Sequence, residues 1–152
     1  MTSAAAQSVR YYISVDDLLG GNRVLPVKPL SPLDWVSVIR GGISSSAVDS
    51  LTKFTRLSQA ELSRALGIPE RTLARRKREG KLNSEESAKL VRLARVIERA
   101  EEVFEDFDAA IDWLKSKNTS LSGSTPLSLL DTDIGAEGVM DTLGRIEHGV
   151  FA

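Results

Sequence analysis

The 152-residue sequence has no cysteine, a single histidine and few aromatic residues. Without cysteine the chain can form neither a disulfide framework nor a thiolate metal site, and a reducing compartment suits it. No apolar run approaches the roughly 18 residues that a membrane-spanning helix needs. The opening residues, MTSAAAQSVRYY, lack the apolar core of a signal peptide. Together these absences predict a cytoplasmic protein with no membrane partner.

Residues that commonly carry catalysis are also scarce. The one histidine, His148, lies near the C-terminus, and no HExxH, P-loop or Gly-rich dinucleotide motif is present. The acidic run from Glu101 to Asp108 could hold a metal or act in acid–base chemistry, but such a run on a helix is more often a solvated face. We therefore predict a protein that is not an enzyme and that has no metal site and no cofactor.

Charge is distributed unevenly along a chain whose net charge is −1. Residues 1–55 carry five positive and four negative side chains, residues 56–99 carry twelve and six, and residues 100–152 carry three and eleven. A basic middle followed by an acidic end suggests two different partners. The alternative is that the two blocks pair with each other inside the molecule.

Helical patterns recur along the chain, whereas the alternation typical of strands does not persist, so the predicted fold class is all-α. Residues 1–30 show little periodicity and are expected to form a tail or arm. Residues 31–83 should form a helical DNA-binding domain that begins with a helix capped by Ser31, and residues 84–108 a connecting or dimerising helix. Residues 109–152 should form a C-terminal module. The apolar seam from Leu90 to Phe107 could be core or dimer interface.

The segment QAELSRALGIPERTLARRKR has the dimensions of a helix-turn-helix. Ser58 and Glu61 form a capping box for its first helix, and Gly67 supplies the sharp turn. Leu62 and Leu73 should pack the two helices together. Because one such module covers only a few base pairs, a homodimer is expected.

The second helix of this motif is strongly basic. At about 100° per residue, Arg71, Arg75 and Arg78 share the face opposite Leu73, where arginine could read guanine in the major groove. An apolar residue is more usual at the position of Arg76, so a shortened or vestigial reading helix is the alternative. Arg76, Lys77 and Lys81 are expected to contact phosphates. The predicted DNA-binding residues are Arg71, Thr72, Arg75, Arg76, Lys77, Arg78 and Lys81.

The C-terminal residues follow a long ordered pattern. It consists of Ala110, Trp113-Leu114, Asn118, Leu121, Gly123, Thr125-Pro126-Leu127, Leu129-Leu130, Thr132, Gly135, Val139, Leu143, Arg145-Ile146 and His148-Gly149-Val150. This pattern resembles the Xre/MbcA/ParS-type antitoxins that are paired with RES-domain toxins. The likeness covers roughly residues 58–152, and Lys117 and Ser122 depart from the family pattern within one loop.

The resemblance implies a function that composition does not reveal. Such antitoxins bind a cognate RES toxin that depletes NAD, block its active site, and repress their own operon through the helix-turn-helix. In this family the C-terminal helix and tail face the toxin. That role points here to Arg145, Glu147, His148, Gly149, Val150, Phe151 and Ala152.

Alternatives remain for both the tail and the whole chain. The apolar end after Gly149 suits entry into a concave pocket, but it could also pack on the last helix. Arg145 could pair with Asp141 instead of a partner. The whole protein could be a plain repressor whose C-terminal module dimerises or senses a ligand, or an interaction protein with a vestigial DNA-binding unit.

Overall fold

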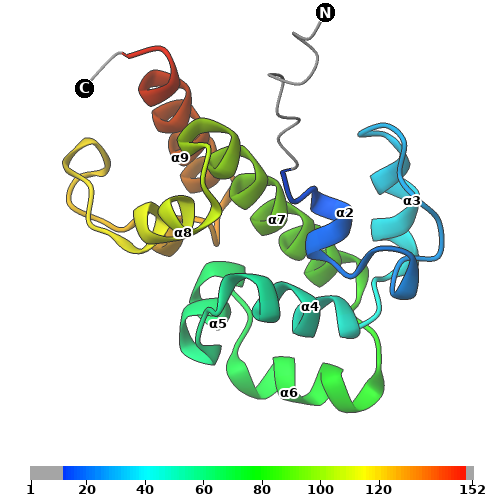
Figure 1. Ribbon diagram of the computed structural model, residues 1–152. Helices are drawn as coiled ribbons and strands as arrows, with labels where there is room; N and C mark the ends of the chain where they lie inside the picture. Colours follow the sequence, from blue (N-terminus) through cyan, green and yellow to red (C-terminus); the bar gives the residue numbers. More distant parts are fainter. Residues whose placement is uncertain (1–11, 150–152) are drawn as a thin grey trace, which may run out of the picture.

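The structure, a computed structural model, describes residues 12–149 (Figure 1). Within this range the chain is helical and contains no strand, which confirms the all-α class. In chain order the helices are α2 (Val15–Leu18), α3 (Asp34–Gly41), α4 (Ser46–Thr55), α5 (Gln59–Leu66), α6 (Glu70–Glu79), α7 (Ser84–Phe104), α8 (Phe107–Lys115) and α9 (Asp133–Glu147). The short 3-10 helices are η1 (Gly21–Arg23), η2 (Thr119–Leu121) and η3 (Pro126–Leu129).

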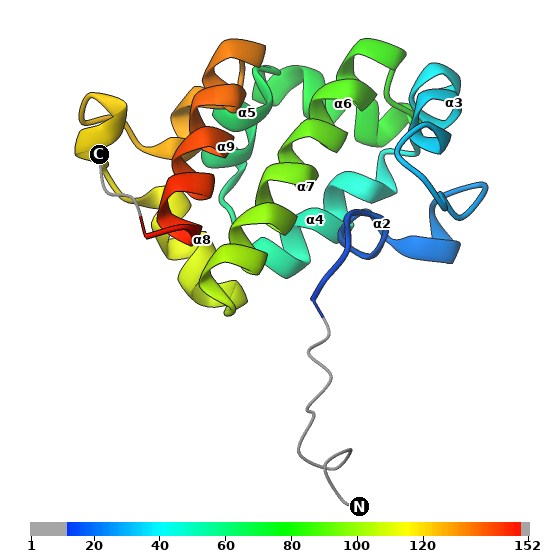
Figure 2. The same cartoon turned by 90° about the horizontal axis from the view of Figure 1, so that it is seen from above.

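Helix α7 runs through the middle of the molecule, and α2, α3, α5, α8 and α9 pack around it (Figures 1 and 2). Its apolar seam is fully buried at Leu90, Leu93, Ile97 and Ala100. The seam is therefore core of the monomer over these residues, which decides between core and dimer interface. Helix α7 is therefore the central helix of the fold.

The ends of the helices in the helix-turn-helix lie where local sequence places them. Ser58 and Glu61 form the expected capping box: the Glu61 N–H donates to Oγ of Ser58 (3.1 Å), and the Ser58 N–H donates to Oε1 of Glu61 (2.9 Å). Gly67 and Gly80 end α5 and α6 in left-handed conformations, with φ of 66° and 90°. These positions favour glycine because a side chain is strained at positive φ.

The start of α3 differs from the sequence prediction. Ser31 was expected to cap this helix, but α3 begins at Asp34. The Asp34 carboxylate accepts hydrogen bonds from the backbone N–H groups of Leu30 (2.7 Å) and Ser31 (3.0 Å). These bonds hold the preceding residues in a turn, so the helix starts two residues later than predicted.

The N-terminal segment also differs from the tail or arm expected over residues 1–30. From Ile13 onward it packs on the core, where Leu18 and Leu19 are fully buried. Two α7 carboxylates hold its backbone: the N–H of Ile13 donates to Glu101 (2.7 Å) and that of Val15 donates to Glu98 (2.9 Å). The helix of this segment is only four residues long, too short to show a helical period in the sequence.

The start of α9 approaches η3 very closely at Gly135. A Cβ atom built on Gly135 would overlap the carbonyl oxygen of Leu129. We therefore expect Gly135→Ala to lower the free energy of unfolding by about 1–3 kcal/mol through overpacking, measured by urea denaturation. Gly138→Ala in the same helix is the control, because nothing lies within 4 Å of the added atom. It should stabilise the protein by up to about 1 kcal/mol, since alanine favours the helix.

Candidate functional sites

Helix α6 presents a cationic face at one edge of the molecule (Figure 1). Leu73 is buried and fixes α6 on the core, whereas Arg71, Arg75 and Arg78 are exposed, and so is Lys81 just beyond the helix. The structure therefore brings together the three arginines that were predicted to read a DNA groove.

The turn between α5 and α6 is closed by Ser63. The Ser63 hydroxyl donates to the carbonyl of Ile68 (2.6 Å), and the Ile68 N–H donates to the carbonyl of Ser63 (3.1 Å). Ser63 precedes and Ile68 follows Gly67, whose left-handed conformation ends α5. This pair of hydrogen bonds fixes the direction in which the chain enters α6, and hence the direction of the cationic face.

Arg76 occupies a different environment from the other arginines of α6. Its Nε donates to Oε1 of Glu86 (2.8 Å), and another guanidinium nitrogen lies 2.9 Å from Oε1 of Glu79. Glu86 also accepts from the backbone N–H of Asn83 in the capping box of α7 (2.9 Å). Although burial opposes the shift, the bond from Arg76 lowers the pKa of Glu86. Arg76 therefore ties α6 to the start of α7, which explains an arginine where an apolar residue is usual.

Lys77 and Thr72 complete the set of predicted DNA-binding residues. The Nζ of Lys77 lies 3.4 Å from Oδ1 of Asp49 in α4. Thr72 is partly buried at the edge of the cationic face. The partners Asp49 and Glu86 were not predicted from sequence, because each lies 10 or more residues from the cation that it pairs with. Nothing in the local pattern shows such a pairing.

At the other end of the molecule, the last turn of α9 is bound to α7 by a double hydrogen bond. Two guanidinium nitrogens of Arg99 donate to the two carboxylate oxygens of Glu147, at 2.9 and 2.6 Å. The bond from Arg99 lowers the pKa of Glu147. We call this pair the Arg99–Glu147 clasp. Glu147 was predicted to face a toxin, but in the free chain it faces its own α7.

The remaining described residues of the predicted toxin-binding set point to solvent. Arg145 and His148 are exposed, and Arg145 makes no ion pair with Asp141 or any other described residue. Gly149 has a φ of 72°, so the chain turns away from the axis of α9 at this residue. Residues 150–152, which complete the predicted set, lie outside the described residues. His148 lies beside the clasp, with its Nε2 4.0 Å from Oε1 of Glu147, whereas Arg145 has no ion-pair partner among the described residues.

The clasp should control the order of the last turn of α9. We expect Arg99→Ala to speed backbone amide exchange in residues 144–148 several-fold, because the carboxylate of Glu147 loses its partner. Because the pKa of Glu147 is lowered in the folded protein, the clasp contributes stability at pH values above the ordinary carboxyl pKa. This contribution is lost as the pH falls through the lowered pKa of the folded protein. When the pH is lowered, amide protection in this turn should therefore fall by more than the protection of residues buried in α7.

Hydrogen exchange read by mass spectrometry or NMR measures this effect. Arg145→Ala is the matched control, because it removes the same charge from the same end of the molecule without touching the clasp. Equal exchange rates in the Arg99→Ala and Arg145→Ala variants would contradict a role of the clasp in ordering this turn.

Two classes of site are not found in the part of the chain that the structure describes. No group of three or more histidine, aspartate or glutamate side chains between residues 12 and 149 could hold a metal ion. None of the described helices is both long enough and apolar enough to cross a membrane.

Comparison with known protein families divides the chain into two matches. Residues 34–95 match the antitoxin Xre-like helix-turn-helix domain. Residues 99–149 match the antitoxin Xre/MbcA/ParS C-terminal toxin-binding domain. The boundary between the two matches falls within α7, so the two domains share this central helix.

Individual relatives agree with these matches. A Yersinia enterocolitica protein named Antitoxin Xre is 40% identical over 119 residues, which span 77% of this chain and 80% of the relative. An Antitoxin Xre of Photorhabdus laumondii is 34% identical over 118 residues, 76% of this chain and 80% of the relative. A Sphingobium protein named Prs ADP-ribosylating antitoxin is 28% identical over 132 residues, 80% of this chain and 83% of the relative.

Proposed function

Because the chain belongs to the Xre antitoxin family, we propose that it inhibits a cognate RES-domain toxin that depletes NAD. Its C-terminal segment enters the active site of the toxin, and α6 binds operator DNA to repress its own operon. The observation that carries the proposal is the match of residues 99–149 to a toxin-binding domain, at whose end α9 leaves polar groups exposed.

Three features support the toxin-binding half of the proposal. Arg145 and His148 are exposed near the end of α9, and the chain turns at Gly149 before three further residues. Those residues, Val150, Phe151 and Ala152, are apolar and small enough together to fill a pocket. The Sphingobium relative is named an antitoxin, which supports a role in neutralising a toxin.

The DNA-binding half rests on the cationic face of α6. Arg71, Arg75 and Arg78 are exposed on a helix that directly follows a helix-turn-helix turn. One such helix covers only a few base pairs, so a homodimer would place two of them on an operator with two half-sites. Operator DNA and a second copy of the chain are therefore the other proposed partners.

Co-expression with the neighbouring gene tests the toxin pairing. The product of that gene alone should arrest bacterial growth and lower the cellular NAD level, and co-expression of this protein should restore both. Growth arrest with an unchanged NAD level would exclude the RES-type chemistry but keep the antitoxin. A neighbouring gene that is not toxic would contradict the proposal and favour a plain repressor with a dimerising or ligand-sensing C-terminal module.

A further inference from the structure

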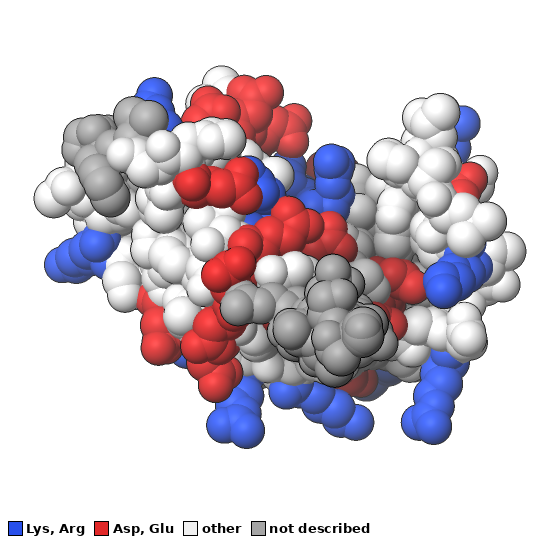
Figure 3. All heavy atoms as spheres, turned by 45° about the horizontal axis from the view of Figure 1, so that its top comes forward, with Lys and Arg blue, Asp and Glu red and all other residues white. Residues whose placement is uncertain are grey.

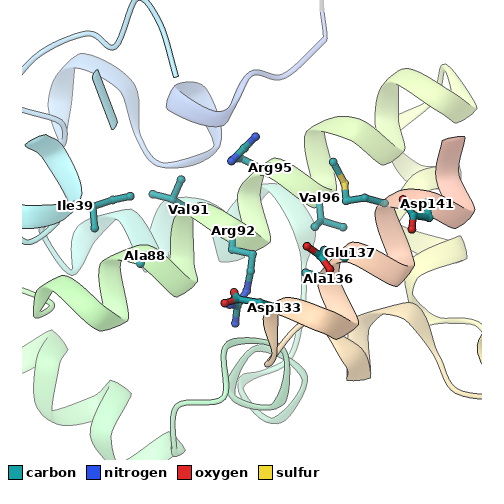
Figure 4. A pocket seen from close by; sticks show the side chains of 11 residues that line it. Ile39, Ala88, Val91, Arg92, Arg95, Val96, Asp133, Ala136, Glu137 and Asp141 are labelled. Atoms are coloured by element: carbon teal, nitrogen blue, oxygen red, sulfur yellow. The ribbon is translucent and has the colours of Figure 1, made fainter. Parts of the chain in front are cut away.

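A groove of about 760 Å³ lies between α3 and α9, with α7 as its floor. Figure 4 shows Ile39 of α3 on one side and Glu137 of α9 on the other, with side chains of α7 between them. Its apolar lining includes Val91, Val96 and Met140. None of its lining residues comes from α6, so an occupant of this groove would leave the cationic face of α6 free.

Beside the groove, α3 and the turn before it form an apolar ridge. Leu30 is 85% exposed, Leu33 is 79% exposed and Val36 is 38% exposed. On the opposite side of the groove, Ile134 in the first turn of α9 is 82% exposed. Large apolar side chains that cluster this openly mark an interaction surface more often than a bare monomer surface. We name Leu30, Leu33 and Val36 the α3 ridge.

The groove also carries charges of both signs that are not used within the described part of the molecule. Arg95 of α7 is exposed, as are Glu137 and Asp141 of α9, and none of the three forms an ion pair with another described residue. Figure 3 shows basic and acidic side chains together in a hollow of the surface. A surface with both signs can pair with a rotated copy of itself, whereas a surface of one sign repels its copy.

We propose that this face is the homodimer interface, in which the α3 ridge of each copy lies in the groove of its partner. A two-fold interface uses the same surface on both subunits, so a ridge and a groove must lie side by side on one face. That condition is met here: Ile39 of α3 lines the groove, and the ridge lies on the same helix and the turn before it.

The inference rests on the dimer within the proposed function, and it commits to a second copy as the occupant. The test uses the full chain and measures molar mass by light scattering after size exclusion. The wild type should be a dimer at micromolar concentrations. Leu33→Glu alters the ridge at a side chain that is already exposed, and Ala88→Glu alters the groove at an exposed residue of α7. Both variants should keep their fold by circular dichroism and run as monomers.

Phe54→Glu is the matched control, because Phe54 is an apolar residue of α4 with 42% exposure that does not line the groove. This variant should stay dimeric.

The outcomes separate this inference from the rest of the proposed function. A monomeric wild type overturns both the interface and the dimer, whatever happens to toxin inhibition. Dimeric Leu33→Glu and Ala88→Glu variants overturn the interface alone. Loss of toxin neutralisation by variants that remain dimeric would mean that the toxin covers this face, which also overturns the inference.

Discussion

Replacing Arg71 and Arg75 together with alanine should weaken operator binding by several kcal/mol, at about 1–3 kcal/mol for each side chain. Both side chains are exposed on α6, opposite the buried Leu73, so they are free to contact a DNA groove. The change removes no described contact that holds the free protein together. The thermal midpoint of the double variant should therefore stay close to that of the wild type.

Fluorescence anisotropy with the promoter of its own operon, read over a salt series, measures the effect. If Arg71 and Arg75 read bases, the double variant should bind the operator and a scrambled sequence with more similar affinities than the wild type does. Lys81→Ala, by comparison, should weaken binding to both DNAs alike and reduce the salt slope by about 1. Arg145→Ala, at the far end of the chain, controls for the loss of positive charge. Unchanged operator affinity in the double variant would favour a vestigial helix-turn-helix.

Arg76 differs from Arg71 and Arg75 because its side chain forms ion pairs with Glu79 and Glu86 of the same chain. Arg76→Ala would leave the buried Glu86 carboxylate without its guanidinium partner. An uncompensated carboxylate at the start of α7 should lower the thermal stability as well as the DNA affinity. Loss of both together distinguishes a residue that positions α6 from Arg71 and Arg75, which should affect binding alone.

Local patterns predicted much of this fold, because caps and glycines act over a few residues. The capping box at Ser58 and the helix end at Gly67 both depend on hydrogen bonds within one turn. The start of α3 was missed because the side chain of Asp34 binds backward to the preceding turn.

Contacts between distant residues were beyond such patterns. Arg99 and Glu147 are 48 residues apart, and Ile13 and Glu101 are 88 residues apart. Each chain segment contains several charged residues of suitable sign, and only the packing of helices selects which of them meet. The sequence could therefore predict the cationic face of α6 from helical geometry, but it could not show that Arg76 and Glu147 are bound within the molecule.

Helix α7 connects the two proposed binding surfaces. Glu86 in its first turn holds Arg76 of α6, and Arg99 further along holds the last turn of α9. Arg99 follows Glu86 by 13 positions, which correspond to about 20 Å of helix. The positions of the DNA-binding and toxin-binding ends are thus fixed relative to one another by a single element, which both family matches share.

Deleting residues 150–152 should abolish neutralisation of the toxin and leave operator binding unchanged. The buried residues of α9, such as Val139 and Leu143, and the Arg99–Glu147 clasp all precede the deletion, so the shortened chain should fold as the wild type does. Growth rescue on co-expression and inhibition of NAD consumption by the purified toxin are the measurements. Operator binding by the same preparation shows that the protein is folded.

The chemistry of the tail can be separated from its length with a matched variant. Replacing Val150-Phe151-Ala152 by Gly-Ser-Gly keeps three residues after Gly149 but removes the apolar side chains. If the tail fills an apolar pocket, this variant should fail as completely as the deletion, because the hydrophobic contact is lost in both. Full neutralisation by the deletion variant would contradict the tail as the inhibitory segment and would place inhibition on Arg145, His148 and the surface of α9.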